Sequence, residues 1–309
     1  MRLDPITQAD PRLITALMEE EEKAWASELD WDYSPIRRIL SNFIDRRILP
    51  GYVALSGSCA LGYTYFLIQK DRTVIGALYA IGPSAQGVAD SLLSHALRSL
   101  VDSRGIRRIE AQIIPLNGID PTPAFLRHGF QNYLREYLEL DLSSSRQQPV
   151  SGMVARIVPW SDDSLSHAAQ VAFRCYRREV DAAICEDYNS ADGCQNYLRS
   201  LVEHPGCGVF LPEASFLCLD SREEPCGFIL ASRISAGSAM IPQISINPSH
   251  QGLGIGSQLI ARALERMRGL GFEKARLTVT RRNRRAFDWY VRLGFVSRRS
   301  FSAYVWLRS

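Results

Sequence analysis

The sequence predicts an α/β (α+β) fold made of two tandem copies of one unit. Three observations lead to this fold class. The 309 residues exceed an ordinary single domain, so two domains are the starting expectation. Strand and helix patterns alternate in both halves, which is typical of a sheet flanked by helices. The third observation is an internal repeat, in which one order of elements occurs twice.

Two amphipathic helices mark the repeat. Apolar residues recur at helical spacing from Leu92 to Leu100 and again from Leu259 to Met267. Setting Ala96-Leu97 on Ala263-Leu264 gives the best match. The matched apolar positions are Leu92, Leu93, Ala96, Leu97 and Leu100 in the first copy, and Leu259, Ile260, Ala263, Leu264 and Met267 in the second.

The resemblance between the copies continues beyond these helices. A β-rich segment follows each of them, at 109–114 and at 275–280. Asn117 follows Gly105 by 12 residues, and Asn283 follows Gly271 by 12 residues. Each copy then closes on a Gly-Phe pair and a last strand, which are Gly129-Phe130 with 133–142 and Gly294-Phe295 with 298–307.

A polar segment separates the two copies. Residues 143–149 contain serines, glutamines and a proline without apolar periodicity, which predicts a linker. We therefore expect one domain over 1–145 and a second over 151–309. In the second domain the patterns predict a strand at 154–158, helices at 163–180 and 189–202, and strands at 215–219, 227–232 and 240–246.

The composition is that of an ordinary globular chain, with 46% hydrophobic and 22% charged residues. No run of about 18 apolar residues is present, and Met1 to Pro5 lack the apolar stretch of a secretory signal. We expect a cytoplasmic protein without membrane contact. The seven cysteines are scattered without metal-ligand spacing, which predicts reduced structural thiols and no metal site.

The most informative segment joins the predicted strand at 240–246 to a helix that begins near Ser257. Its loop reads Gln251-Gly252-Leu253-Gly254-Ile255-Gly256. Glycine allows backbone N–H groups to converge, and the start of a helix adds unpaired donors and partial positive charge. We interpret the loop as an anion cradle suited to a diphosphate. A tight turn without a ligand is the alternative for the glycines taken alone, and the Lys-Ser/Thr of a nucleoside triphosphatase loop is absent.

Two motifs in order give the sequence a family resemblance. The first is Gln251-x-x-Gly254-x-Gly256, preceded by Asn247-Pro248, and the second is Asn283-x-x-Ala286-x-x-x-Tyr290-x-x-x-Gly294-Phe295. Together they resemble the GNAT superfamily of N-acetyltransferases, closely over 240–296 and in element order over about 154–307. The resemblance implies a mixed, mostly antiparallel sheet that is splayed between its fourth and fifth strands, with acetyl-CoA in the splay.

The resemblance also implies the residues of the site. It places the backbone of Gln251, Gly252, Leu253, Gly254, Ile255 and Gly256 around the CoA diphosphate, with Ser257 at the start of the helix. The main chain of Ile244 and Ile246 would contact the pantetheine arm. Asn283 would lie near that arm, and Ala286 belongs to the same cofactor-binding set. Tyr290 matches the tyrosine that faces the thioester sulfur.

The chemistry of acetyl transfer gives Tyr290 a role. Attack of a neutral amine on the thioester produces a tetrahedral anion, which needs N–H donors, and then expels a thiolate, which needs a proton. A tyrosine with a pKa of about 10 can donate that proton. Aromatic packing within Trp289-Tyr290-Val291 is the alternative, and the spacing to Asn283 and Gly294 favours the catalytic role.

The sequence does not identify the general base. Glu179, Glu186 and Asp187 lie near the first predicted helices of the second domain, and Glu223 and Glu224 lie in a strand turn. A solvated surface position is the more typical environment for each of these acids. His250 borders the glycine loop, where it suggests a phosphate contact or no role, and not a base.

A basic run, Arg281-Arg282-Asn283-Arg284-Arg285, lies within a segment, 261–300, that holds 12 Lys or Arg against 3 acids. The run could meet a nucleic-acid backbone, the 3′-phosphate of CoA or only water. Because Asn283 interrupts it and no aromatic residue is interleaved, we favour a solvated face with one or two residues on CoA.

The first copy lacks parts of this site. Its loop is expected at 85–91, two residues shorter than the second loop, with two of the glycines missing. Asp90 would repel a diphosphate there. Counting back from Phe130 as from Phe295 puts Phe125, which has no proton to donate, at the position of Tyr290. We expect the first copy to keep the fold without the cofactor or the chemistry.

These observations predict an acyl-CoA-dependent N-acyltransferase that moves acetyl from acetyl-CoA to the amine of an unidentified small molecule or peptide, without a metal ion. One alternative is an acetyl-CoA-binding sensor or interaction protein without turnover. Another is a nucleic-acid-binding module that uses the Arg-rich run, although a net charge of +3 is too small by itself to argue for nucleic acid. A homodimer is left open.

Overall fold

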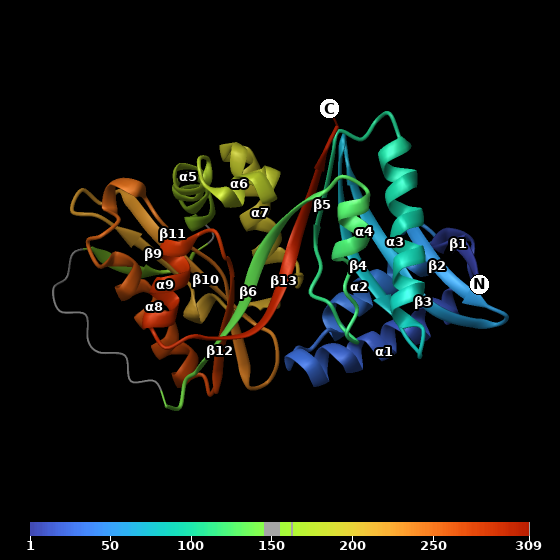
Figure 1. Cartoon of the computed structure of the whole chain (residues 1–309). Coiled ribbons are helices and arrows are strands. Elements are labelled where there is room, and N and C mark those ends of the chain that lie inside the picture. The colour runs from blue at the N-terminus through green and yellow to red at the C-terminus, as the bar shows by residue number, and fades with distance from the viewer. Residues whose placement is uncertain (145–154, 162, 309) are drawn as a thin grey trace. The chain divides into compact units, whose positions relative to one another are not determined.

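The chain forms two compact units in the computed structural model, which describes residues 1–144, 155–161 and 163–308 (Figure 1). Unit 1 comprises Met1–Arg135 and Phe301–Ser309, and unit 2 comprises Glu136–Ser300. The sequence predicted contiguous domains over 1–145 and 151–309. Unit 1 instead also contains residues from 301 onward, and unit 2 begins at Glu136. Residues 145–149 of the predicted linker lie outside the described residues.

Unit 1 is one sheet with helices on its faces. Its strands follow the order β1-β2-β3-β4-β5-β13, in which β4 and β5 are parallel and the other pairs are antiparallel. The elements are β1 (Arg2–Pro5), η1 (Ile6–Gln8), α1 (Pro11–Leu29), α2 (Ser34–Asp45), β2 (Gly51–Ser56), β3 (Cys59–Gln69), β4 (Arg72–Ala80), α3 (Ala85–Asp102), β5 (Arg108–Gln112), α4 (Thr122–Arg127) and the end of β13 (Val296–Leu307).

The helix α3 carries the apolar stripe that the repeat predicted, and it starts earlier than expected. Residues 85–91, predicted as a loop, form its first two turns. The prediction was wrong because Ala85, Val88 and Ala89 are buried and extend the stripe of Leu92 and Leu93 toward the start of the helix at spacings of three and four residues. The connection from β4 to α3 is therefore only residues 81–84.

Unit 2 repeats this arrangement. Its strand order is β6-β12-β11-β10-β9-β7, with β8 paired to β10, and β11 and β12 are parallel. The elements are β6 (Gln131–Asp141, of which unit 2 holds residues 136–141), β7 (Arg156–Pro159), α5 (Ser164–Tyr176), α6 (Val180–Ile184), η2 (Glu186–Asn189), α7 (Ala191–Glu203), β8 (Val209–Phe210), η3 (Pro212–Ala214), β9 (Phe216–Leu219), β10 (Pro225–Arg233), β11 (Ser238–Ile246), η4 (Pro248–His250), α8 (Ile255–Gly269), β12 (Lys274–Thr280), α9 (Arg284–Arg292) and the start of β13.

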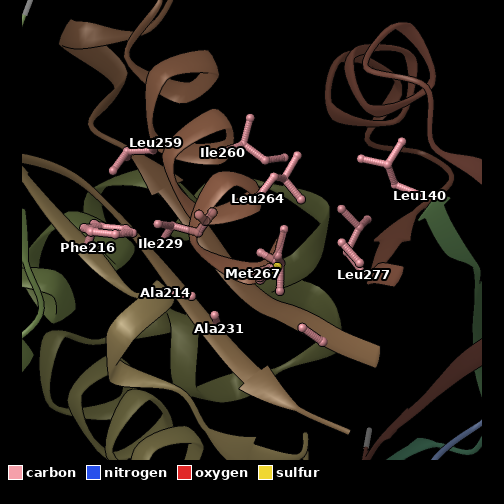
Figure 2. Packing of buried hydrophobic residues seen from close by; sticks show 14 of the residues in the cluster. Leu140, Ala214, Phe216, Ile229, Ala231, Leu259, Ile260, Leu264, Met267 and Leu277 are labelled. Carbon is pink, nitrogen blue, oxygen red and sulfur yellow. The ribbon is translucent and has the colours of Figure 1, made fainter. Parts of the chain in front are cut away.

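The strand β10 shows how the sheet of unit 2 is covered on both faces. Phe228 and Leu230 pack in the cluster with α5 and α7, whereas Ile229 and Ala231 pack against α8. This alternation follows from the two-residue period of a strand. On the α8 side, the stripe from Leu259 to Met267 closes over Phe216, Ile229 and Leu277 (Figure 2).

A bulge separates two strands in unit 2. Only the first residues of β11 and β12 pair, from Ser238↔Lys274 to Met240↔Arg276. The β10–β11 register shifts between Leu230 and Ser232, which leaves an extra residue in β11 at Ile241 or Pro242. A bulge bends its strand, and proline has no N–H to donate to a neighbour. Beyond the bulge, residues 241–246 of β11 and 277–280 of β12 do not pair with each other. This gap between the two strands is the splay expected between the fourth and fifth strands.

Unit 1 has the same splay. Its β4 and β5 pair only from Arg72↔Arg108 to Ile75↔Ala111, and the β3–β4 register shifts at the next residue, Gly76. A Cβ at Gly76 would lie 2.2 Å from the Tyr65 ring, so a larger residue here would displace that ring. Among the described residues, no helix is long and apolar enough to cross a membrane.

Candidate active site

The free edge of β11 is the first part of the site. The hydrogen bond from Asn247 N–H to the Cys226 carbonyl, 2.8 Å, shows which β11 residues face β10. Because facing and non-facing residues alternate in an antiparallel ladder, the N–H and C=O groups of Ile244 and Ile246 face the splay. The Tyr176 hydroxyl donates to the Ile244 carbonyl, 3.2 Å, and Gln251 Nε2 donates to the Ile246 carbonyl, 3.1 Å. These two residues are the pair that the family resemblance implied for contacts with the pantetheine arm.

The glycine loop supplies a row of backbone donors. Gly252 and Gly254 have φ of +82° and +83°, in the left-handed region that favours glycine, and Gly254 is the N-cap of α8 without a side-chain cap. Within the described part of the chain, the N–H groups of Gly252, Leu253, Gly254, Ile255, Gly256 and Ser257 have no hydrogen-bond partner. Uncapped donors at a helix start attract an anion, so this stretch fits a diphosphate.

Gln251 and Arg285 connect the loop to the helix α9. The Arg285 guanidinium donates to Gln251 Oε1 at 2.6 Å, while the other end of the same amide holds the Ile246 carbonyl. Arg285 is thus a member of the basic run that reaches the loop. By contrast, Arg281 lies over the Phe287 ring and pairs with Glu136 at 3.4 Å, which ties it to the sheet.

Asn283 is the N-cap of α9. Its Oδ1 accepts from Ala286 N–H at 3.2 Å, and its own N–H donates to the Thr280 carbonyl at 2.9 Å. This cap starts α9 directly after β12 and orients the helix that carries Tyr290. The Nδ2 group of Asn283 has no hydrogen-bond partner among the described residues, so it can donate to a ligand.

Tyr290 is buried on α9. Its ring contacts Trp289 and Phe295, with centroids 4.9 Å and 5.8 Å away. Burial raises the pKa of the phenol well above its ordinary value of 10, and the charge of Asp181 raises it further. The phenol has no hydrogen-bond partner in the described part of the chain, so no other group there accepts its proton.

Asp181 is a site residue that the sequence did not single out. It lies in the first turn of α6, where its Oδ1 accepts from the Thr280 hydroxyl at 2.6 Å. Its charge also affects Cys175, whose thiol pKa is raised to about 11, mainly by burial, and whose surroundings include the N–H of Ile246. Asp181 on α6, Cys175 near the end of α5 and Tyr290 on α9 thus lie near one another, and Thr280 at the end of β12 holds the Asp181 carboxylate.

The sequence also offered other acids. Glu179 is exposed, although its charge too raises the pKa of the Cys175 thiol, and Glu223 pairs with Arg156. The imidazole of His250 contacts the Ser249 hydroxyl at 2.9 Å and Asp220 at 3.3 Å, so both ring nitrogens are engaged outside the splay. No signal in the sequence marks Asp181, because α6 has five residues and is too short to show a period.

The corresponding region of unit 1 is closed by its own side chains. Asn117 Nδ2 donates to the Ala80 carbonyl at 3.1 Å, at the end of β4. Gln86 Oε1 accepts from Asp120 N–H at 2.8 Å, and its Nε2 donates to the Asp120 carbonyl at 3.0 Å, which ties the start of α3 to the next loop. Four residues, 81–84, connect β4 to α3, whereas eight residues, 247–254, connect β11 to α8. The loop of unit 1 is thus shorter by four residues, although the sequence predicted a difference of two.

Phe125 occupies the place in unit 1 that Tyr290 occupies in unit 2. Phe130 N–H donates to the Phe125 carbonyl at 3.2 Å, and Phe295 N–H donates to the Tyr290 carbonyl at 3.1 Å. Both residues also contact the aromatic ring five positions later. Phe125 stacks on Tyr304 with centroids 3.9 Å apart, so this position serves packing in unit 1.

Part of unit 2 matches a known protein family. Residues 178–295 match the model of the acetyltransferase (GNAT) family. A comparison with curated protein sequences gives no match.

Several solved structures are similar over the whole chain. A tandem GNAT protein from the clavulanic acid biosynthesis pathway has 14% identity and a TM-score of 0.66, with 99% of this chain and 98% of that chain covered. A GCN5-related N-acetyltransferase from Sphaerobacter thermophilus has 14% identity and a TM-score of 0.65, with 99% and 95% covered. An acetyltransferase from the GNAT family from Colwellia psychrerythraea has 10% identity and a TM-score of 0.58, with 100% of both chains covered. The likeness confirms the predicted fold of two tandem copies.

Proposed function

Because residues 178–295 match the model of the acetyltransferase (GNAT) family, we propose that the chain is an N-acetyltransferase with one active centre, in unit 2. In this proposal it moves an acetyl group from acetyl-CoA to the amine of a small molecule or peptide. The observation that carries the proposal is the row of unpartnered N–H groups at residues 252–257 beside the free edge of β11.

Each part of acetyl-CoA has a matching group in unit 2. The donors of residues 252–257 would hold the diphosphate, and Arg285, which contacts Gln251 of the loop, would supply a cation for a phosphate oxygen. Ile244 and Ile246 would pair with the amides of the pantetheine arm as an added strand would. Gln251 would then release the Ile246 carbonyl, and Asn283 Nδ2 would add a donor.

Tyr290 would act as the general acid. The thiolate that leaves the tetrahedral adduct needs a proton at the moment the C–S bond breaks. A phenol with a raised pKa keeps its proton throughout the neutral range, and its burial keeps bulk water from competing. The Tyr290 hydroxyl is the group we assign to this transfer.

Calorimetric titration and a thiol-release screen test the proposal. We expect acetyl-CoA to bind with one site per chain, and free thiol to accumulate with at least one class among amines, aminoglycosides, polyamines, amino acids and peptide N-termini. Lack of acetyl-CoA binding would refute the site. Binding without thiol release across the whole screen would instead indicate a sensor.

A further inference from the structure

Asp181 is a half-buried carboxylate at the edge of the splay without a cation beside it. Its Oδ1 accepts from Thr280, and its Oδ2 has no partner within the described part of the chain. No lysine, arginine or histidine of the described residues lies within ion-pair distance of it. A partly buried charge is costly unless a counter-charge or hydrogen bonds compensate it, so this geometry favours a cationic ligand.

Buried acids elsewhere in unit 2 show the contrast. Glu139 pairs with Arg276 and with Arg298, both at 2.9 Å, and Glu136 accepts from two serines and pairs with Arg281. These carboxylates are neutralised by the chain itself and serve its packing. Asp181 is held in place by an uncharged donor, Thr280, which orients the carboxylate but leaves its charge uncompensated.

The position of Asp181 relative to Tyr290 connects it to the reaction. The Asp181 carboxylate is close enough to raise the pKa of the Tyr290 phenol, and the same charge acts on Cys175 and Tyr176 at the end of α5. A carboxylate and a phenol that face one space are suited to take a proton and to give one. Asp181 lies on α6 and is bonded to Thr280, the last residue of β12, and Tyr290 lies on α9, the helix that follows β12 along the chain.

We propose that Asp181 binds the ammonium group of the acceptor and removes its first proton, which assigns the acceptor to the primary amines that are cationic at neutral pH. This inference rests on the proposed acetyl transfer. Thr280 is a positioning residue, because it acts only through Asp181.

The protons balance in four steps. The acceptor R–NH3⁺ gives a proton to the Asp181 carboxylate and becomes R–NH2. Its nitrogen attacks the acetyl carbon, so the C–N bond forms and the thioester oxygen becomes an anion. The C–S bond then breaks while Tyr290 gives its proton to the thiolate sulfur. The positively charged nitrogen returns a proton to Tyr290, and Asp181 releases its proton to solvent, which leaves the amide and free CoA.

The test uses the full chain, acetyl-CoA and two small probes. Ethylamine is an ammonium ion at neutral pH, whereas hydroxylamine is neutral there and needs no proton removed before attack. The key variant is Asp181→Asn, which keeps the shape and can still accept from Thr280. The matched control is Glu179→Gln, which removes the same charge from an exposed side chain two residues away.

We expect Asp181→Asn to lower kcat/KM for ethylamine by about 10²-fold, the usual effect of losing a positioned base. Its kcat/KM for hydroxylamine and its Kd for acetyl-CoA should stay close to the wild-type values. Glu179→Gln should resemble the wild type with both probes. Thr280→Val should lose ethylamine transfer, and Thr280→Ser should restore it.

Three results would overturn the inference. They are an equal loss with both probes, no loss with either, and a wild-type chain that binds acetyl-CoA but does not accelerate ethylamine acetylation. The last result counts because the proposed role of Asp181 depends only on the ammonium group of the acceptor, and ethylamine has that group. Failure of acetyl-CoA to bind the wild type is a different outcome, since it would remove the proposed function itself.

Discussion

Replacing Tyr290 by phenylalanine tests the proposed general acid with little effect on the fold. The substitution removes one oxygen atom that has no hydrogen-bond partner among the described residues. The ring contacts with Trp289 and Phe295 remain. No buried donor or acceptor is orphaned, so we expect the free energy of unfolding to change by less than about 0.5 kcal/mol.

The effect on turnover should be much larger. A positioned general acid contributes about 10²-fold or more, and two factors of ten correspond to about 2.7 kcal/mol of activation free energy. The Kd for acetyl-CoA should not change, because the phenol would contact only the sulfur end of the cofactor. Since burial raises the pKa of Tyr290 above its ordinary 10.0, wild-type kcat should show no loss from tyrosine ionisation between pH 7 and 10.

The assay is thiol release with saturating acetyl-CoA and amine, combined with calorimetric Kd values and urea unfolding. Tyr304→Phe is the matched control in unit 1, where the buried phenol bonds to the Thr122 hydroxyl at 2.8 Å. The control should lose about 1 kcal/mol of stability and no turnover. A Tyr290→Phe chain with wild-type kcat, or one that loses kcat only in proportion to stability, would refute the reasoning.

Three further predictions follow. Gly254→Asp should raise the Kd for acetyl-CoA by more than about 100-fold with a loss of only about 1–2 kcal/mol of stability, because the left-handed backbone strains the new residue and its carboxylate repels a diphosphate; an unchanged Kd by calorimetry would contradict this. The same titration of the wild type should give one acetyl-CoA per chain, and a value near two would show that unit 1 binds as well. Glu21 is buried and its pKa is raised to about 7 from 4.5, chiefly by burial; the folded state therefore holds its proton longer than the unfolded state, and the free energy of unfolding should fall between pH 4.5 and 7 by up to about 3 kcal/mol. Glu21→Gln should lack that decline in urea titrations, and parallel curves for the two chains would refute it.

Much of the fold could be predicted because it depends on local patterns. The stripe from Leu259 to Met267 has helical period and is buried as expected. The left-handed glycines at 252 and 254 mark the loop, since few other residues adopt that backbone. The sequence placed Asn283 near the cofactor and did not predict that it caps α9, the helix that carries Tyr290.

Other parts depend on contacts between distant segments and could not be predicted. Asp181 meets Thr280 across 99 residues of chain, and nothing local distinguishes it from Glu179 or Asp187. The first turns of α3 were read as a loop because Gly87 resembled the loop glycines, whereas it is helical. The partners of β6 and β13 were not predicted either, because an apolar strand pattern does not specify which sheet edge it joins.

The end of β13 belongs to unit 1, and this affects the order in which the two units can fold during translation. Residues 301–308 lie in unit 1, where Ala303 to Leu307 pair with β5, yet they follow all of unit 2 along the chain. The Tyr304 ring packs in the buried cluster around α3. The Arg308 guanidinium donates to the carbonyls of Val101 and Ser103, both at 2.7 Å. The ribosome therefore finishes the second unit before it supplies the strand that completes the first. Unit 1 emerges early but matures late, and its open sheet edge at β5 has to be protected while the remaining chain is translated.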